Sequence, residues 1–138
     1  MKTKKPTIED YIYWIKKTED MSYSDPKSVR KYNIAVEKAS EYWRDRNADW
    51  CDDEYHQFVA LTRHEDPLVR ASVVVAIIVK VKLKDSTLNE FLSILDSAVL
   101  KLNRDRRLDF KMWMSCWKKG MIKTQNPYNG FVFSISGV

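Results

Sequence analysis

Hydrophobic residues recur along most of the chain at steps of three and four, the spacing that places side chains on one side of an α-helix. The second such stretch is clear because Val29, Tyr32 and Val36 are followed at the same steps by Ala39 and Trp43. The pattern predicts an all-α fold of about six helices joined by short connections. These helices are expected near residues 8–15, 26–46, 52–63, 69–83, 86–102 and 106–119.

Several predicted helices begin with a polar residue that can accept hydrogen bonds from the free N–H groups of the first turn. Thr7 precedes the first helix, and Asp25 and Asp66 precede the second and the fourth. Each aspartate is followed by a proline, whose missing N–H costs nothing at the first helical position. We also expect Ser86 to cap the fifth helix and Gly120 to end the sixth as its C′ residue.

The segment at residues 69–83 is apolar almost throughout, and its secondary structure is ambiguous. Its β-branched side chains suit a buried strand, and residues 79–84 alternate apolar residues with lysine. Against a strand, the segment is long, follows a helix start at Asp66 and Pro67, and has few strands to pair with. We therefore expect a central helix that neighbours cover on nearly all sides.

The last part of the chain has a different pattern. Turn residues at 126–130 precede Phe131, Phe133 and Ile135, which alternate with other residues as a short strand would. A single strand is not stable alone, so we expect it to lie on the helices or to be poorly ordered. The length of 138 residues suits one domain covering residues 1–138, with residues 121–138 as an appended tail.

A short motif occurs twice. Asp25 to Arg30 recurs approximately as Asp66 to Arg70, and the two Val-Arg pairs lie 40 positions apart. This distance is the period of a two-helix HEAT or armadillo repeat. In such a unit the aspartate caps the helix, the valine enters the core, and we expect the arginine to reach back to an acidic group in the neighbouring loop.

Residues 64–70, with the sequence His-Glu-Asp-Pro-Leu-Val-Arg, resemble the start of the second helix of a HEAT repeat, and the resemblance covers about residues 25–102. It implies HEAT-like antiparallel helical hairpins. Small HEAT-like proteins of this length include bacterial immunity proteins, which neutralise a toxin encoded beside them, and this chain is similar to them in its many aromatic and charged residues. The partner that this resemblance implies is a cognate toxin domain.

The composition favours a protein of the cytoplasm that does not enter membranes. The longest apolar run, at residues 73–79, is far shorter than the roughly 20 residues that a membrane-spanning helix needs. The basic start of the chain is followed by too short an apolar stretch for a signal peptide. Cys51 and Cys116 could form at most one bridge, so free thiols are expected. The net charge of +5 permits attraction to nucleic acid or to an acidic protein.

Catalytic signatures are weak in this sequence. The three glycines lie near the end, so neither a P-loop nor a dinucleotide-binding motif can be written. Cys51, His56 and His64 lie among acidic residues, but without the pair spacing of a metal site, and Cys51 with His56 lacks a third group that would complete a nucleophile and base. We therefore expect no enzyme activity, no metal and no cofactor.

Two groups of residues are candidate binding surfaces. The first mixes aromatic and charged residues, as interface hot spots do, and we predict it to bind the protein partner: Trp43, Arg44, Trp50, Asp52, Asp53 and Glu54. The second is the basic segment at residues 101–123, which contains Trp113 and Trp117 and could bind nucleic acid through Lys101, Arg104, Arg106, Arg107 and Lys111. A capped loop over a buried aromatic, and a solvated helix face over core tryptophans, are the structural alternatives.

We therefore predict a non-catalytic protein-binding module, an immunity protein that binds and neutralises a cognate bacterial toxin. The alternative is a helical module that binds nucleic acid through residues 101–123.

Overall fold

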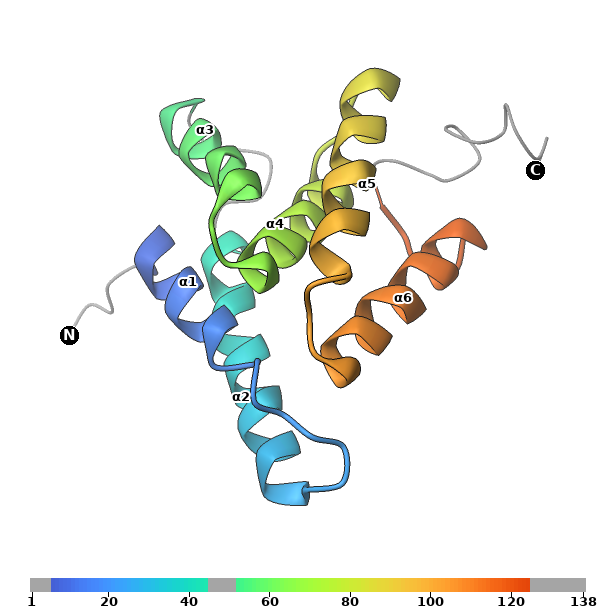
Figure 1. Ribbon diagram of the computed structural model, residues 1–138. Coiled ribbons are helices and arrows are strands. Elements are labelled where there is room, and N and C mark those ends of the chain that lie inside the picture. The colour runs from blue at the N-terminus through green and yellow to red at the C-terminus, as the bar shows by residue number, and fades with distance from the viewer. Residues whose placement is uncertain (1–5, 45–51, 125–138) are drawn as a thin grey trace. The chain divides into compact units, whose positions relative to one another are not determined.

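The computed structural model describes residues 6–44 and 52–124, and within these ranges the chain forms helices and no strand (Figure 1). The prediction of an all-α fold is confirmed. None of the helices described is long and apolar enough to cross a membrane. In chain order the elements are α1 (Ile8–Lys16), α2 (Pro26–Arg44), α3 (Asp52–Ala60), the 3-10 turn η1 (Leu61–Arg63), α4 (Pro67–Lys80), α5 (Asp85–Val99) and α6 (Arg104–Lys118).

The predicted caps of the early helices are confirmed. Thr7 and Asp10 form a capping box, in which the Asp10 N–H donates to Thr7 Oγ1 at 3.2 Å and the Thr7 N–H donates to Asp10 Oδ2 at 2.9 Å. The Asp25 carboxylate accepts from the Lys27 N–H at 3.1 Å, and Asp66 accepts from the Leu68 N–H at 2.8 Å. Each of these bonds satisfies a donor that the first turn of a helix leaves without a partner.

The boundaries of the later helices differ from the prediction. Ser86 is not the cap of α5, because the helix already begins at Asp85 after Lys84, whose backbone is extended and makes no side-chain capping bond. Asp85 instead places its negative charge in the first turn, where the helix dipole favours it. Helix α6 begins two residues earlier than expected, since Asn103 caps it through a bond from the Arg106 N–H at 2.9 Å.

The end of α6 forms as predicted around Gly120. This glycine has φ +73, a conformation that side chains of L-residues rarely adopt. The Gly120 N–H donates to the Trp117 carbonyl at 2.9 Å, and the Met121 N–H donates to the Cys116 carbonyl at 3.0 Å. Together these two bonds make a Schellman motif, which ends the helix and satisfies two of its last carbonyl groups.

The chain divides into two compact units, of which the first ends at Phe58 and the second begins at Val59. In the first unit α1 packs against α2. Tyr11, Tyr42 and Phe58 meet in a buried aromatic cluster, with ring centroids 5.1 to 5.7 Å apart. Edge and stacked contacts at these distances add to the hydrophobic burial. That residues 1–138 form a single domain stays a prediction.

In the second unit, the apolar segment whose secondary structure was ambiguous forms the helix α4. It packs against α5 and η1, and α5 in turn meets α6 (Figure 1). Most of the β-branched residues that suited a strand are fully buried in α4, namely Val73, Val74, Ile77 and Ile78, while Val75 and Val79 are half-buried. Burial of such a side chain contributes about 1.5 to 3 kcal/mol, which outweighs the few tenths by which β-branching weakens a helix. Helix α4 ends at Lys80 rather than at residue 83, because Val81 is extended.

The Arg70 side chain forms hydrogen bonds from α4 to the loop that precedes this helix. Its Nη1 donates to the His64 carbonyl at 2.7 Å and to the Glu65 carbonyl at 3.1 Å. The arginine therefore reaches back to the loop as expected, but the acidic group predicted as its partner is wrong, since main-chain carbonyl groups accept these bonds. The predicted strand at residues 131–135 lies outside the residues that the structure describes.

Candidate functional site

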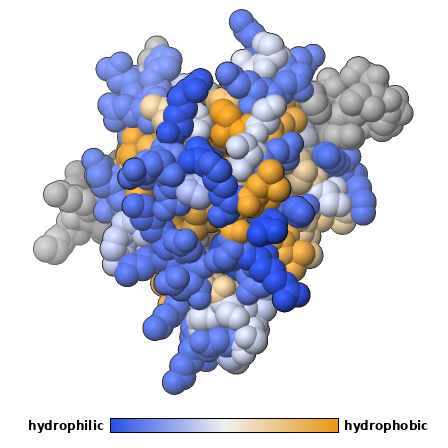
Figure 2. Space-filling model, in the orientation of Figure 1, coloured by the Kyte–Doolittle hydropathy of each residue, from blue (hydrophilic) through white to orange (hydrophobic). Residues whose placement is uncertain are grey.

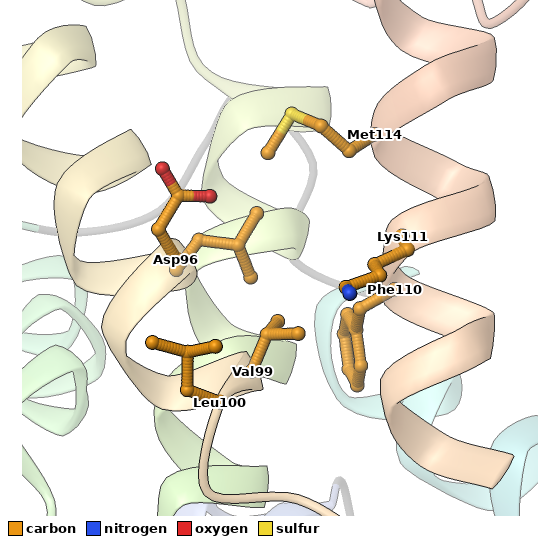
Figure 3. Close-up of a pocket in the computed structure, with 7 residues that line it drawn as sticks. Asp96, Val99, Leu100, Phe110, Lys111 and Met114 are labelled. Atoms are coloured by element: carbon orange, nitrogen blue, oxygen red, sulfur yellow. The ribbon is translucent and has the colours of Figure 1, made fainter. Parts of the chain in front are cut away.

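An apolar groove lies between α5 and α6, in the second unit. Its residues come from both helices, and its volume is about 260 Å³. Figure 2 shows hydrophobic atoms at the surface in the region of these two helices. In Figure 3, Phe110, Lys111 and Met114 extend from α6 toward the side of α5 on which Asp96, Val99 and Leu100 lie. The complete lining is Leu95, Asp96, Val99, Leu100, Phe110, Lys111 and Met114.

The groove runs from the core to open solvent. Val99, at the inner side of the groove, is only 7% exposed, whereas Leu100, at the rim of the groove, is 71% exposed. Leu108 and Met112 of α6 are also largely exposed, but their spacing from Phe110 places them on the other side of that helix. When a side chain of a partner enters an apolar pocket, an exposed leucine beside that pocket also gains contacts with the partner. An isolated surface leucine has no such pocket beside it.

The inward face of α6 combines an aromatic residue with a buried ion pair. Trp117 is fully buried, but near the start of the helix the buried residue is Arg106, at 2% exposure. Its Nη2 lies 3.0 Å from Asp109 Oδ2, one turn along the same helix. Burial of a guanidinium costs solvation free energy, which the nearby carboxylate offsets.

Positive charge lines the α6 side of the groove. Lys111 is part of the lining, and Arg107 and Lys118 lie one turn from it or from Met114 on the same helix. Arg107 is held at the helix start, where its Nη2 donates to the Leu102 carbonyl at 3.1 Å. Asp96 stands on the α5 side as the one acidic lining residue. The groove therefore favours a partner whose apolar side chain is flanked by acidic ones.

Only some of the basic side chains of the predicted nucleic-acid-binding site are exposed to solvent. Lys101, Arg104 and Lys111 are exposed, and Arg107 is half-buried. Arg106 is buried with Asp109, so its guanidinium does not face solvent and is not part of an exposed basic surface. The stacked pair of Trp113 and Trp117, with centroids 6.0 Å apart, leaves the fully buried Trp117 no face for a nucleic-acid base.

The predicted protein-binding site lies around a stretch that the structure does not describe. Trp50 is outside the described residues, and the side chains of Trp43 and Asp52 are too. Arg44 is exposed at the end of α2 and pairs with Glu37 at 2.9 Å. Asp53 is exposed and Glu54 is half-buried in the first turn of α3. The two described acids follow each other on one short helix, and the set as a whole stays a prediction.

Among the described residues, no three His, Cys, Asp or Glu side chains gather closely enough to hold a metal ion. His64 and the nearby Asp66 stabilise the loop before α4, since His64 Nδ1 accepts from the Asp66 N–H at 3.0 Å and Asp66 caps α4. Cys51 lies outside the described residues. Burial, together with the neighbouring Tyr42, raises the pKa of Tyr11 above its usual range, which keeps the phenol protonated.

Apart from Lys111, the groove residues are not predicted as a site from the sequence. Leu95 and Val99 belong to the apolar stripe of the helix predicted at residues 86–102, and Phe110 lies in the helix predicted at residues 106–119, so helical periodicity alone does not mark them as a site. The available signal was Leu100, which follows Val99 directly and therefore lies off the stripe of α5. Comparison of this chain with protein-family models, with curated proteins and with solved structures finds no match.

Proposed function

We propose that this chain is a non-catalytic protein-binding module, an immunity protein that neutralises a cognate bacterial toxin. The observation that carries the proposal is the α5–α6 groove, an apolar pocket with the exposed Leu100 at its rim. Such a pocket receives an anchoring side chain of a partner, and anchors of this kind supply most of the binding free energy in protein interfaces.

The charges around the groove define the segment of the toxin that binds there. Lys111 and the neighbouring basic residues of α6 favour an amphipathic helix whose apolar face is flanked by Asp or Glu. The net charge of +5 adds a general attraction to an acidic partner surface, which raises the association rate at low salt. Toxin binding through the groove requires no chemistry from this chain.

Growth rescue is the direct test. The product of the neighbouring gene is expressed alone and together with this protein, and growth should be lost in the first case and restored in the second. Leu100→Asp places a charge at the groove rim and should abolish rescue. Leu108→Asp makes the same change at an exposed leucine of α6 that does not line the groove, so it is the matched control and should rescue.

The outcomes separate the function from the face. If the neighbouring product is harmless, or if its toxicity persists with the folded protein present, the immunity role is wrong. If both Asp variants rescue while Trp50→Ala does not, the partner binds the set around Trp50 predicted from the sequence. Circular dichroism of each variant checks that folding is retained.

Nucleic-acid binding is a second candidate because Lys101, Arg104 and Lys111 are exposed near one another in the chain. Binding of this kind weakens steeply with salt, and Arg104→Ala should reduce the slope by about one unit. Absence of binding to RNA and DNA at low salt would exclude it.

A further inference from the structure

A second, polar hollow lies in the same unit, formed by η1, the start of α4 and one face of α5. It is open to solvent and has a volume of about 510 Å³, within the range of small-molecule sites. Unlike the α5–α6 groove, it is lined mainly by hydroxyl and cationic side chains. The lining residues are Thr62, Arg63, Arg70, Glu90, Ser93, Ile94, Ser97 and Lys101.

Helical spacing brings one wall of the hollow together. Glu90, Ser93 and Ser97 lie at steps of three and four on α5, so they share one face of that helix. Lys101 continues the same spacing just beyond the end of α5, where the negative end of the helix dipole favours a cation. The result is a line of two hydroxyl groups leading to an ammonium group.

The opposite wall supplies two guanidinium groups, and one of them is held in place. Arg70 is fixed by the bonds from its Nη1 to the His64 and Glu65 carbonyls. Those bonds do not use the donors on its Nη2 and Nε, and a guanidinium has five N–H donors in a rigid plane. Arg63 is more exposed, with 78% of its side chain accessible to solvent. A pre-positioned arginine binds an anion with less loss of entropy than a free one.

The lining of the hollow carries three cationic side chains and one carboxylate, so its net positive charge attracts an anion. The carboxylate, on Glu90, lies 3.9 Å from Arg63, and both side chains are well exposed. A pair with this distance and exposure contributes little, so a ligand can replace it. Cations together with hydroxyl donors match the several acceptor oxygens of a phosphate group. The lining contains no aromatic residue on which a base could stack.

We propose that the hollow formed by Arg63, Arg70, Ser93, Ser97 and Lys101 is a binding site for a phosphate group, recognised through its oxygens rather than through an attached base. The site does not depend on the proposed immunity role, because it uses none of the residues that line the α5–α6 groove.

Calorimetric titration with inorganic pyrophosphate, at constant ionic strength held with chloride, tests the site. Saturable binding should be about fivefold weaker in Arg63→Gln and in Lys101→Gln, the loss expected for one exposed charge contact. Lys82→Gln removes the same charge at an exposed position before α5, so its affinity should match that of the unaltered protein. These variants change exposed side chains, which limits the risk of unfolding.

Glu90→Gln provides a test in the opposite direction. It removes the carboxylate that competes with the anion for Arg63, so pyrophosphate affinity should rise about two- to fivefold. Asp20→Asn makes the same charge change in the loop before α2 and should leave the affinity unchanged. A gain of affinity cannot result from damage to the fold, and this separates a binding role from a structural one.

A short single-stranded RNA, titrated in the same way and as a competitor, distinguishes the source of the phosphate. If it displaces pyrophosphate and its binding shows the same variant pattern, the phosphate belongs to a polynucleotide backbone. If pyrophosphate binds and the RNA does not compete, the phosphate belongs to a small ester. The proposal is overturned if neither probe binds saturably, or if the Arg63 and Lys101 variants behave as Lys82→Gln does.

Discussion

Removing the carboxylate of Asp109 should destabilise the second unit far more than removing an exposed charge from the same helix. Asp109 lies 3.0 Å from the guanidinium of Arg106, which is 2% exposed. Asp109→Ala leaves that cation buried without this partner, and breaking a buried pair on one side typically costs about 3 to 5 kcal/mol. The Asp109 side chain is itself 24% exposed, so water partly replaces it and about 2 to 3 kcal/mol is the expected loss.

Urea unfolding followed by circular dichroism measures this loss. With a slope of about 1 to 3 kcal/mol per molar urea, the midpoint for Asp109→Ala should fall by about 0.7 to 3 M. Lys111→Ala removes a charge from the exposed side of α6 and should change stability by less than about 0.5 kcal/mol. Replacing both partners, as Arg106→Met with Asp109→Leu, should recover most of the lost stability, because no buried charge remains.

Equal urea midpoints for Asp109→Ala and Lys111→Ala would show that the Asp109 carboxylate does not stabilise the buried guanidinium. A double replacement less stable than Asp109→Ala alone would show that the cost comes from lost packing and not from a buried charge that has lost its carboxylate.

Three further predictions concern the fold. Gly120→Ala should lower the stability by about 1 kcal/mol in thermal unfolding, because the residue has φ +73 while a Cβ there would meet nothing within 4 Å. Tyr11 should stay protonated above its ordinary pKa near 10 while the unfolded chain ionises, so stability is full below that pH and falls above it; Tyr11→Phe should reduce this fall in alkaline unfolding. Ile77→Ala should cost about 2 to 5 kcal/mol in urea unfolding, and an unchanged midpoint would contradict the placement of Ile77 in the core.

Local signals in the sequence predicted most of the fold. Thr7, Asp25 and Asp66 act within three residues of their own positions, so their capping role is independent of the rest of the molecule. Gly120 likewise ends α6 through its own backbone conformation. Ser86 was the wrong choice of cap because Asp85 also favours a helix start, and single-residue boundaries depend on small differences between such neighbours.

The candidate sites depend on side-chain orientation, loop geometry and helix packing, and these were less predictable. Arg106 stood in a run of basic residues, and nothing local showed that it alone would turn inward toward Asp109. Phe110 and Val99 each belong to an apolar pattern, but the pattern does not show how closely α5 and α6 approach each other. Arg70 was expected to reach the preceding loop, whereas its bonds to carbonyl groups required the loop geometry itself.

Hydrogen exchange of this protein with and without the neighbouring gene's product tests most directly whether the α5–α6 groove binds a toxin. We predict slower exchange on complex formation at residues 96–100 and 110–114, the parts of α5 and α6 that form the groove, with the protection lost in Leu100→Asp and kept in Leu108→Asp. A complex that forms with full affinity while exchange at both segments stays unchanged would show that the partner binds elsewhere.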